Sequence, residues 1–430
     1  MIYAKSKFIA QGTYGCTYIP DLPCSNKPPT ANKQKHSFVS KLQRINPQTE
    51  REEMIGKIIK EKIKRYNSMY SAIIESCPVN ISEIEPNELE KCAVVTNNTS
   101  QYNELGNKQS KVEYKAFKMR NAGKSSLGKY FLSLLDKNPK KIMKRIFEIH
   151  IYLLKSLDKL SKLEPPIIHY DLKDNNIMYN EKLNVPIIID FGLSFELDTS
   201  KEYNREISLE NYYVFYEKYP PWCIELVLLS YIVQTIVEMN KQDITSKIQD
   251  QDITALQNIC YTFINENEVF QAFTLDETSK MQQGLINYVN SYLGKTWKDL
   301  FNNLQKSYSS WDNYSLSVIF LFYITDMITI INPNTNPNTN TNPNTNPNPI
   351  IIQYTNILKT IIMGIPNNTD EPWRPSISDI ISNLKELTSN INKKNYEKLI
   401  TDIENTDKNT IELITQKYNK FKLTNTRKLE

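Results

Sequence analysis

The chain has 430 residues, 40% of them hydrophobic, and a formal net charge of +4 at pH 7. This length is too great for one average domain and suits two lobes with insertions, and the apolar content can supply a sizeable core. The small charge gives no indication of nucleic-acid or membrane binding, and residues 1–10 lack the continuous apolar region of a signal peptide. We therefore expect a cytoplasmic protein with neither a nucleic-acid partner nor a membrane span.

The cysteines and histidines form no metal-binding pattern. Six cysteines are scattered without C-x-x-C spacing, and the chain has only three histidines. A zinc site is therefore not expected, and reduced thiols are the expected state in a cytosolic protein. One alternative stays open, in which Cys77 and Cys92 pair or bind a metal within an insertion.

The first segment with a chemical pattern is residues 8–18, which read Phe-Ile-Ala-Gln-Gly-Thr-Tyr-Gly-Cys-Thr-Tyr. Gly12 and Gly15 would let backbone N–H groups approach phosphate oxygens, although a G-x-x-G pattern alone predicts only a turn. A short β-prone run then ends at Lys41, and a helix-like stretch follows from Arg51 to Arg65. Its isoleucines recur at helical spacing, which predicts one apolar face. They are Ile55, Ile58, Ile59 and Ile63.

The central segment carries the strongest pattern. Residues 167–176 read Ile-Ile-His-Tyr-Asp-Leu-Lys-Asp-Asn-Asn, and residues 187–192 read Ile-Ile-Ile-Asp-Phe-Gly. Phosphoryl transfer needs a carboxylate to orient and deprotonate the attacking hydroxyl, oxygen ligands for Mg²⁺, and positive charge near the transferred group. This stretch supplies all of these groups in Asp171, Lys173, Asn176 and Asp190.

Two apolar runs, 224–237 and 315–331, have a composition that could be mistaken for membrane spans. The first is short and the second contains Asp326, so both fit buried helices better. Between Glu225 and Trp311 the chain has helical periodicity and predicts extra helices, over about 226–308, that would cover a surface where a protein could dock.

Three further segments are predicted to lie outside the core. The polar stretch from Ser76 to Lys111 predicts surface loops. An Asn-Pro-Asn-Thr repeat over 332–349 has nothing apolar to bury and predicts a disordered surface loop. The tail from Ile391 is charged and is predicted to be helical, and the sequence assigns no chemistry to it.

The central segment resembles the catalytic loop and the Asp-Phe-Gly of eukaryotic-type protein kinases, matching H-R-D-L-x-x-x-N and D-F-G at all positions except Tyr170. Residues 8–18 resemble the glycine-rich loop of that family, with Ala10 at the first glycine and Thr17 at the usual valine. Residues 38–41 resemble its V-A-I-K strand. The resemblance implies an α+β, two-lobed fold with a β-rich N-lobe over 1–120, a hinge near 119–123, a mainly helical C-lobe over 121–390 and a tail over 391–430.

The resemblance also implies a role for each matching residue. Asp171 would orient the substrate hydroxyl and accept its proton, with Lys173 near the γ-phosphate, and Asn176 and Asp190 would hold Mg²⁺. Lys41 would fix the α- and β-phosphates of ATP, and Glu53 fits best as the glutamate that positions it, with Glu52 the near alternative. The expected ATP-binding residues are Ala10, Gln11, Gly12, Thr13, Tyr14, Gly15, Thr17, Val39, Lys41 and Glu53.

Two later segments extend the resemblance to about residue 385. Residues 311–320 are similar to the large-lobe helix with an Asp-x-Trp-Ser-x-Gly pattern, in which Tyr314 and Ser317 are substitutions. Asp312 would then hold the catalytic-loop backbone by hydrogen bonds. Trp373-Arg374-Pro375-Ser376 resembles a late kinase helix, whose arginine pairs with a glutamate that ends the activation segment; Glu225 is the candidate, in a poor version of A-P-E.

The function that the resemblance implies is ATP- and Mg²⁺-dependent phosphorylation of Ser/Thr in protein substrates. Lys173 is typical of Ser/Thr-directed members, and Tyr170, in place of an arginine, predicts constitutive activity. Two alternatives stay open, a pseudokinase that acts as a scaffold and a small-molecule kinase of the aminoglycoside or choline type. The heavy use of Asn, Lys, Ile and Tyr with 10 glycines suggests an AT-rich genome, and with the divergent motifs it resembles kinase-like proteins of large DNA viruses of protists. Such a protein would lie in the host cytoplasm or the virion.

Overall fold

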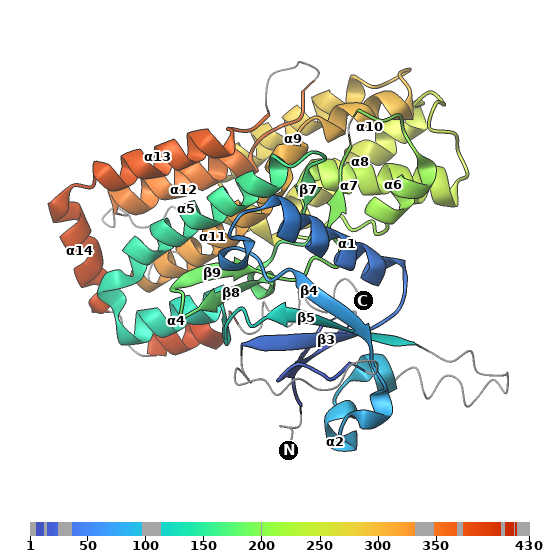
Figure 1. Ribbon diagram of the computed structural model, residues 1–430. Helices are drawn as coiled ribbons and strands as arrows, with labels where there is room; N and C mark the ends of the chain where they lie inside the picture. The colour runs from blue at the N-terminus through green and yellow to red at the C-terminus, as the bar shows by residue number, and fades with distance from the viewer. Residues whose placement is uncertain are drawn as a thin grey trace. The chain divides into compact units, whose positions relative to one another are not determined.

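The computed structural model describes residues 6–12, 15–24, 37–96, 113–198, 200–331, 348–367, 373–405, 409–416 and 418. The chain forms two compact units, of which the first comprises Met1–Ser125 and Asn176–Glu196 and the second comprises Ser126–Asn175 and Leu197–Leu429. The first unit is rich in β-strands and the second is mainly helical (Figure 1). This composition confirms the expected α+β class.

The first unit contains an antiparallel sheet with the spatial strand order β1-β2-β3-β5-β4. Successive side chains of a strand point to opposite faces, so Ala116 and Phe117 of β5 join different apolar clusters, the first with Leu42 and the second with Val39. The strands of this sheet are β1 (Lys7–Gln11), β2 (Gly15–Ile19), β3 (Phe38–Arg44), β4 (Ile73–Pro78) and β5 (Tyr114–Arg120).

Helix α1 (Pro47–Lys62) packs against this sheet. Asn46 caps it, because its side chain accepts from the N–H of Thr49 while the Thr49 hydroxyl accepts from the N–H of Asn46, and Pro47 at the first position has no N–H to satisfy. The helix therefore begins before the expected start at Arg51. Gly56 lies so close to Ile73 of β4 that a side chain there would collide with it. The other elements of this unit are η1 (Tyr66–Ser68), η2 (Ile81–Glu83), α2 (Pro86–Leu89), the antiparallel hairpin β8 (Ile177–Asn180) and β9 (Val185–Ile188), and β10 (Phe195–Glu196).

Two disulfide bonds join β4 and the segment after it to the N-terminal part of the first unit. They pair Cys16 with Cys92 and Cys24 with Cys77. The expectation of reduced thiols is therefore wrong for these four residues, and so is the alternative in which Cys77 pairs with Cys92. The free cysteines of the described residues, Cys223 and Cys260, are buried.

The segment expected to form surface loops from Ser76 to Lys111 is partly structured. Ser76 lies in β4, and Ile84, Cys92 and Val95 are buried in one cluster with β2. The expectation is wrong for 76–96 because two cross-links and this apolar cluster fix the segment, whereas 97–111 lie outside the described residues.

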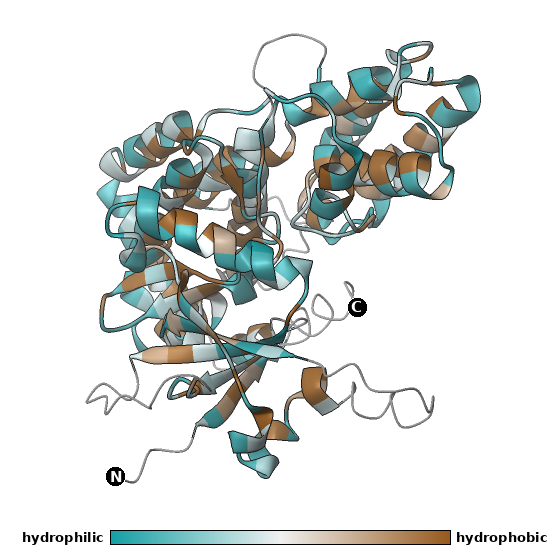
Figure 2. Cartoon of the chain, turned by 45° about the vertical axis from the view of Figure 1, so that its right-hand side comes forward, coloured by the Kyte–Doolittle hydropathy of each residue, from teal (hydrophilic) through white to brown (hydrophobic). Residues whose placement is uncertain are grey.

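Several helices of the second unit carry apolar and polar residues on different sides (Figure 2), whereas the helices that begin at Ile224 and Trp311 are apolar on most sides. Helices α5, α11, α12 and α13 pack against one another (Figure 1). The longer helices are α4 (Leu127–Lys137), α5 (Ile142–Ser161), α6 (Arg205–Asn211), α7 (Ile224–Tyr231), η5, a π-helix (Ile232–Met239), α8 (Asp250–Glu266), α9 (Leu275–Asn290), α10 (Trp297–Gln305), α11 (Trp311–Ile331), α12 (Pro349–Ile362), α13 (Ile377–Ser389) and α14 (Lys393–Glu404). The short elements are η3 (Pro139–Lys141), η6 (Glu268–Ala272), η7 (Tyr308–Ser310) and β7 (Ile167–Ile168), while β6 (Ser125–Ser126) and η4 (Asp174–Asn176) each include residues of both units.

Several predictions for this unit can be compared with its helices. The apolar runs 224–237 and 315–331 form helices, as expected, and most of their residues up to 327 are buried. No helix among the described residues is long and apolar enough to cross a membrane. Helices α8, α9 and α10 lie within 226–308, where extra helices were expected, and α14 lies in the described part of the tail. Residues 332–347 of the repeat lie outside the described residues, but the expected loop is wrong at its end, because Asn348 caps α12 and Pro349 begins it.

Candidate active site

Lys41 is the centre of a buried charged cluster in the first unit. Strand β3 carries it, and its side chain is 8% exposed. Its Nζ lies 3.1 Å from both carboxylate oxygens of Glu52 and 2.6 Å from Oδ1 of Asp190. Burial alone would lower the pKa of Lys41, but the charges of Asp190 and Glu52 outweigh it and raise that pKa above its usual value. Lys41 is therefore a fixed positive charge.

The glutamate that meets Lys41 is Glu52, and the expectation of Glu53 is wrong. Glu52 is buried and also accepts from Nε2 of Gln43 at 3.0 Å. Glu53 contacts other residues, since its carboxylate accepts from Ser76 Oγ at 2.5 Å and pairs with Lys115 Nζ at 3.0 Å. Sequence spacing contained a signal for the correct choice, because Glu52 shares a face with the buried residues three, four and seven positions later. Those residues are Ile55, Gly56 and Ile59.

Asp190 and Asn176 lie on backbone segments that are bonded to each other. The N–H of Ile189 donates to the carbonyl of Asn176 at 2.9 Å, across the open end of the β8–β9 hairpin. Asp190 has a φ of 64°, and the next residue, Phe191, is buried edge-on against Tyr70. A carboxylate and an amide carbonyl are hard oxygen ligands of the kind that Mg²⁺ prefers.

The hairpin of β1 and β2 forms the expected glycine-rich segment. Ala10 pairs with Thr17, and the N–H of Gly12 donates to the carbonyl of Gly15 at 2.9 Å. A Cβ at Gly15 would collide with Gln43 and with the backbone of β3, whereas one at Gly12 would make only an ordinary van der Waals contact with the Gly15 carbonyl, at 3.9 Å. Packing on β3 thus requires glycine at position 15 and leaves position 12 free of steric demand.

The remaining residues expected at the ATP site are placed as follows. Gln11 pairs with Cys16 across the hairpin, and Thr17 lies opposite Lys41 in the sheet. Val39 is buried and pairs with Met119 of β5. Thr13 and Tyr14 lie outside the described residues.

Asp171 lies in the second unit with both carboxylate oxygens engaged. Tyr219 donates its hydroxyl to Oδ1 at 2.7 Å, and Lys173 Nζ lies 2.8 Å from Oδ2. Burial and then the charge of Asp171 raise the pKa of Tyr219 well above its usual value, so this hydroxyl keeps its proton and donates. Sequence reasoning did not identify Tyr219, because its contact with Asp171 follows no local spacing rule.

The backbone before Asp171 is held by Asp312 of α11, as expected. The carboxylate of Asp312 accepts from the N–H groups of His169 at 2.8 Å and Tyr170 at 3.0 Å. Tyr170 has a φ of 69°, and its buried ring packs against Trp222, with 4.9 Å between ring centroids. The Trp222 indole N–H donates to the Tyr170 carbonyl at 2.9 Å. Tyr170, which stands where the kinase motif has arginine, is thus part of an apolar core.

Glu225 and Arg374 form the expected ion pair inside the second unit. Arg374 Nη2 lies 2.9 Å from Glu225 Oε2, its Nη1 contacts Oε1, and the two side chains are 0% and 1% exposed. Burial would raise the pKa of Glu225, but the guanidinium of Arg374 outweighs it and lowers that pKa. The pair therefore joins α7 to the segment before α13.

The structure groups the candidate residues by unit. Lys41, Asn176 and Asp190 belong to the first unit, where Glu52 takes the place expected for Glu53, and Asp171 and Lys173 belong to the second. Among the described residues no group of three or more His, Cys, Asp or Glu side chains is arranged to hold a metal ion.

Comparison with known proteins finds short matches to kinases. No protein-family model matches the chain. It is 36% identical over 83 residues to the "Probable inactive serine/threonine-protein kinase samkD" of Dictyostelium discoideum, which is 19% of this chain and 13% of that protein. It is 50% identical over 44 residues to the "Probable serine/threonine-protein kinase samkC" of the same organism, which is 10% of this chain and 5% of that protein. It is 48% identical over 48 residues to its "Probable serine/threonine-protein kinase samkA", which is 11% of this chain and 7% of that protein.

These matches span a small part of each relative. They support a likeness of short segments to serine/threonine protein kinases. Since all three relatives come from Dictyostelium discoideum, they give no support to the suggested likeness to viral proteins.

Proposed function

We propose that the chain transfers the γ-phosphoryl group of ATP to Ser or Thr hydroxyls of protein substrates. The observation that carries the proposal is the position of Lys41 between Glu52 and Asp190. Asp190 is 149 positions from Lys41 in sequence. In the kinase motifs, Lys41 stands at the position that binds phosphate and Asp190 at the position that binds the metal ion. A buried lysine kept charged by two carboxylates is suited to bind a polyanion such as ATP.

In this proposal the first unit binds the nucleotide. Lys41 pairs with the α- and β-phosphates, and Glu52 fixes the direction of its ammonium group. The hairpin from Ala10 to Thr17 lies over the phosphates, where Gly12 has no side chain in the way. Asn176 and Asp190 would hold Mg²⁺ through their hard oxygen atoms. When bound, the ion neutralises charge on the phosphates.

The second unit contributes the groups that act on the acceptor. Asp171 orients the substrate hydroxyl and takes its proton as the oxygen attacks the γ-phosphorus. A new O–P bond forms, the bond from the γ-phosphorus to the β–γ bridging oxygen breaks, and ADP leaves with that electron pair. Lys173 balances charge on the transferred group. Because these steps involve little covalent chemistry by the protein, positioning and electrostatics supply most of the rate increase.

A second candidate function is nucleotide binding without turnover, in a scaffold protein. Two observations favour it, the relative that is described as probably inactive and the alanine at position 10 in the first glycine position. A small-molecule kinase is a weaker candidate, since the Asp-Phe-Gly, the Arg-Pro-Ser and Lys173 argue against it.

In the test, the purified chain is incubated with Mg²⁺ and with ATP labelled at the γ-phosphate. The acceptor is either a generic basic protein or a panel of amino alcohols. Labelled phosphoserine or phosphothreonine in the protein supports the proposal. Label on the amino alcohols alone would favour the small-molecule kinase. A rise in melting temperature with Mg-ATP, but no transfer to any acceptor, would favour the scaffold, because a ligand that binds the native state stabilises it by mass action.

A further inference from the structure

Asp174 is a carboxylate between Lys173 and Asn176 that the proposed chemistry does not use. Its Oδ1 accepts from the backbone N–H of Gly128 at 2.7 Å and from the hydroxyl of Tyr323. Its Oδ2 accepts from the hydroxyl of Tyr418. Three donors from α4, α11 and the C-terminal tail thus meet on one side chain of the second unit. Hydrogen bonds to an ionised group are about twice as strong as neutral ones.

Tyr418 belongs to the tail, to which sequence patterns assign no function. It is 8% exposed, and its hydroxyl also lies 2.9 Å from Ser126 Oγ. Its ring covers Gly128 so closely that a Cβ at that position would collide with it. Burial and then the charge of Asp174 raise the pKa of both Tyr418 and Tyr323, so both hydroxyls keep their protons and donate to the carboxylate.

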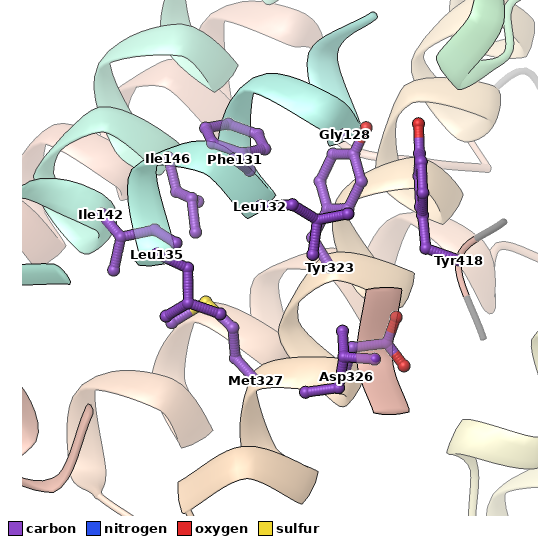
Figure 3. Close-up of a pocket in the computed structure, with 11 residues that line it drawn as sticks. Gly128, Phe131, Leu132, Leu135, Ile142, Ile146, Tyr323, Asp326, Met327 and Tyr418 are labelled. Carbon is purple, nitrogen blue, oxygen red and sulfur yellow. The ribbon is translucent and has the colours of Figure 1, made fainter. Parts of the chain in front are cut away.

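The apolar contact beside these hydroxyls is incompletely packed. Ile414 and Tyr418 of the tail border a cavity that is otherwise lined by α4, α5 and α11. In Figure 3 the rings of Tyr323 and Tyr418 lie next to each other with their hydroxyls pointing the same way. The bonds of these hydroxyls to Asp174 are therefore polar contacts that attach the tail beside this pocket.

We propose that Asp174 is a positioning residue and that the tail, through Tyr418, is a working part of the phosphoryl-transfer machinery. Through Tyr418 the tail holds Asp174, and Asp174 fixes the loop that carries Asp171 and Lys173. The effect on catalysis rests on the proposed function, whereas the effect on loop order does not. The tail is therefore an intramolecular support of the catalytic loop.

The experiment compares the full-length wild type with Tyr418→Phe, Asp174→Asn and their double variant. Tyr418→Phe keeps the ring over Gly128 and removes only the hydroxyl that donates to Asp174. The matched control is Tyr396→Phe, which removes a hydroxyl from a partly buried tyrosine of α14 in the same tail. Hydrogen–deuterium exchange of the amides in 171–176 reports loop order, and kcat with the KM for ATP reports function.

We expect amides of 171–176 in Tyr418→Phe to exchange about tenfold faster than in the wild type, and kcat to fall about fivefold with the KM for ATP changed less than twofold. In the Asp174→Asn background, removing the Tyr418 hydroxyl should have a smaller further effect than in the wild type, because both changes break the bond between Tyr418 and Asp174. Tyr396→Phe should match the wild type in both readouts.

Three results decide the proposal. Unchanged exchange of 171–176 in Tyr418→Phe would overturn it, and so would additive losses in the double variant or an equal loss in Tyr396→Phe. If the wild type transfers no phosphate, the proposed function fails, and the exchange data still decide whether the tail orders the loop.

Discussion

Glu52→Gln is the substitution that separates the structure's assignment from the one that sequence spacing favoured. It keeps the shape of the side chain and removes the charge that faces Lys41. The side chains of Lys41 and Glu52 are 8% and 3% exposed, and breaking a buried pair by removing one partner costs about 3–5 kcal/mol. Because Lys41 keeps Asp190 as a partner, we expect a loss of about 3 kcal/mol in the free energy of unfolding, the low end of that range.

Glu53→Gln is the matched control, one position along the same helix. Its carboxylate is 36% exposed and pairs with Lys115, which is 26% exposed, so the charge is worth at most about 1 kcal/mol. Urea titrations followed by circular dichroism give both free energies, and equal slopes with denaturant would show that the unfolded states are comparable.

Kinetics provide the functional half of this prediction. A small misplacement of a positioned group can cost about 100-fold in rate, and we expect a loss of that size in kcat/KM for Glu52→Gln. Glu53→Gln should stay within about threefold of the wild type, a difference of under 1 kcal/mol in transition-state stabilisation. The reasoning would be refuted if Glu53→Gln lost more activity than Glu52→Gln, or if the two variants were equally stable.

Three other predictions concern regulation, cross-linking and pH. Tyr170 is buried against Trp222 and offers no cation to a phosphorylated activation segment, so phosphatase treatment should leave the initial rate unchanged; a tenfold fall restored by rephosphorylation would contradict this. The two disulfides close loops of 76 and 53 residues, each worth about 4 kcal/mol in the chain-entropy account, so dithiothreitol should lower the melting temperature, and an unchanged value would argue against the pairing. Burial raises the pKa of Tyr170, Tyr219 and Tyr354 in the folded chain, whereas unfolded tyrosines titrate near pH 10. The contribution of these tyrosines to the free energy of unfolding should therefore be fully present below about pH 10 and should be lost as the pH rises above it toward the folded pKa values. Urea midpoints measured from pH 8 to about 11 would show this loss.

Sequence patterns correctly predicted the contacts between residues that belong to short motifs. Asp312 meets the backbone of the catalytic loop, and Arg374 meets Glu225, at the positions where the motifs placed them. These contacts were predictable because each motif fixes both the residue type and the element that carries it. The choice between Glu52 and Glu53 depended on which of the two shares the buried face of the helix. That face contains Ile55 and Ile59 together with Glu52, whereas Glu53 lies beside it.

The contacts that sequence reasoning missed join residues far apart in the chain. Nothing near Cys16 or Cys24 indicates a partner in β4 or beyond α2, because pairing depends on how the strands bring the thiols together. The hydroxyl of Tyr219 on Asp171, and that of Tyr418 on Asp174, are likewise set by tertiary packing. A local pattern of spacing contains no information on such pairs.

Phosphate transfer by the wild type beside Asp171→Asn and Asp190→Ala tests the central claim most directly. The first variant removes the proposed base and the second removes a proposed metal ligand that also contacts Lys41. With labelled Mg-ATP and a protein acceptor, we predict phosphoserine or phosphothreonine from the wild type and rates at least about 1,000-fold lower from both folded variants. Near wild-type rates in either variant at saturating Mg-ATP would contradict the account.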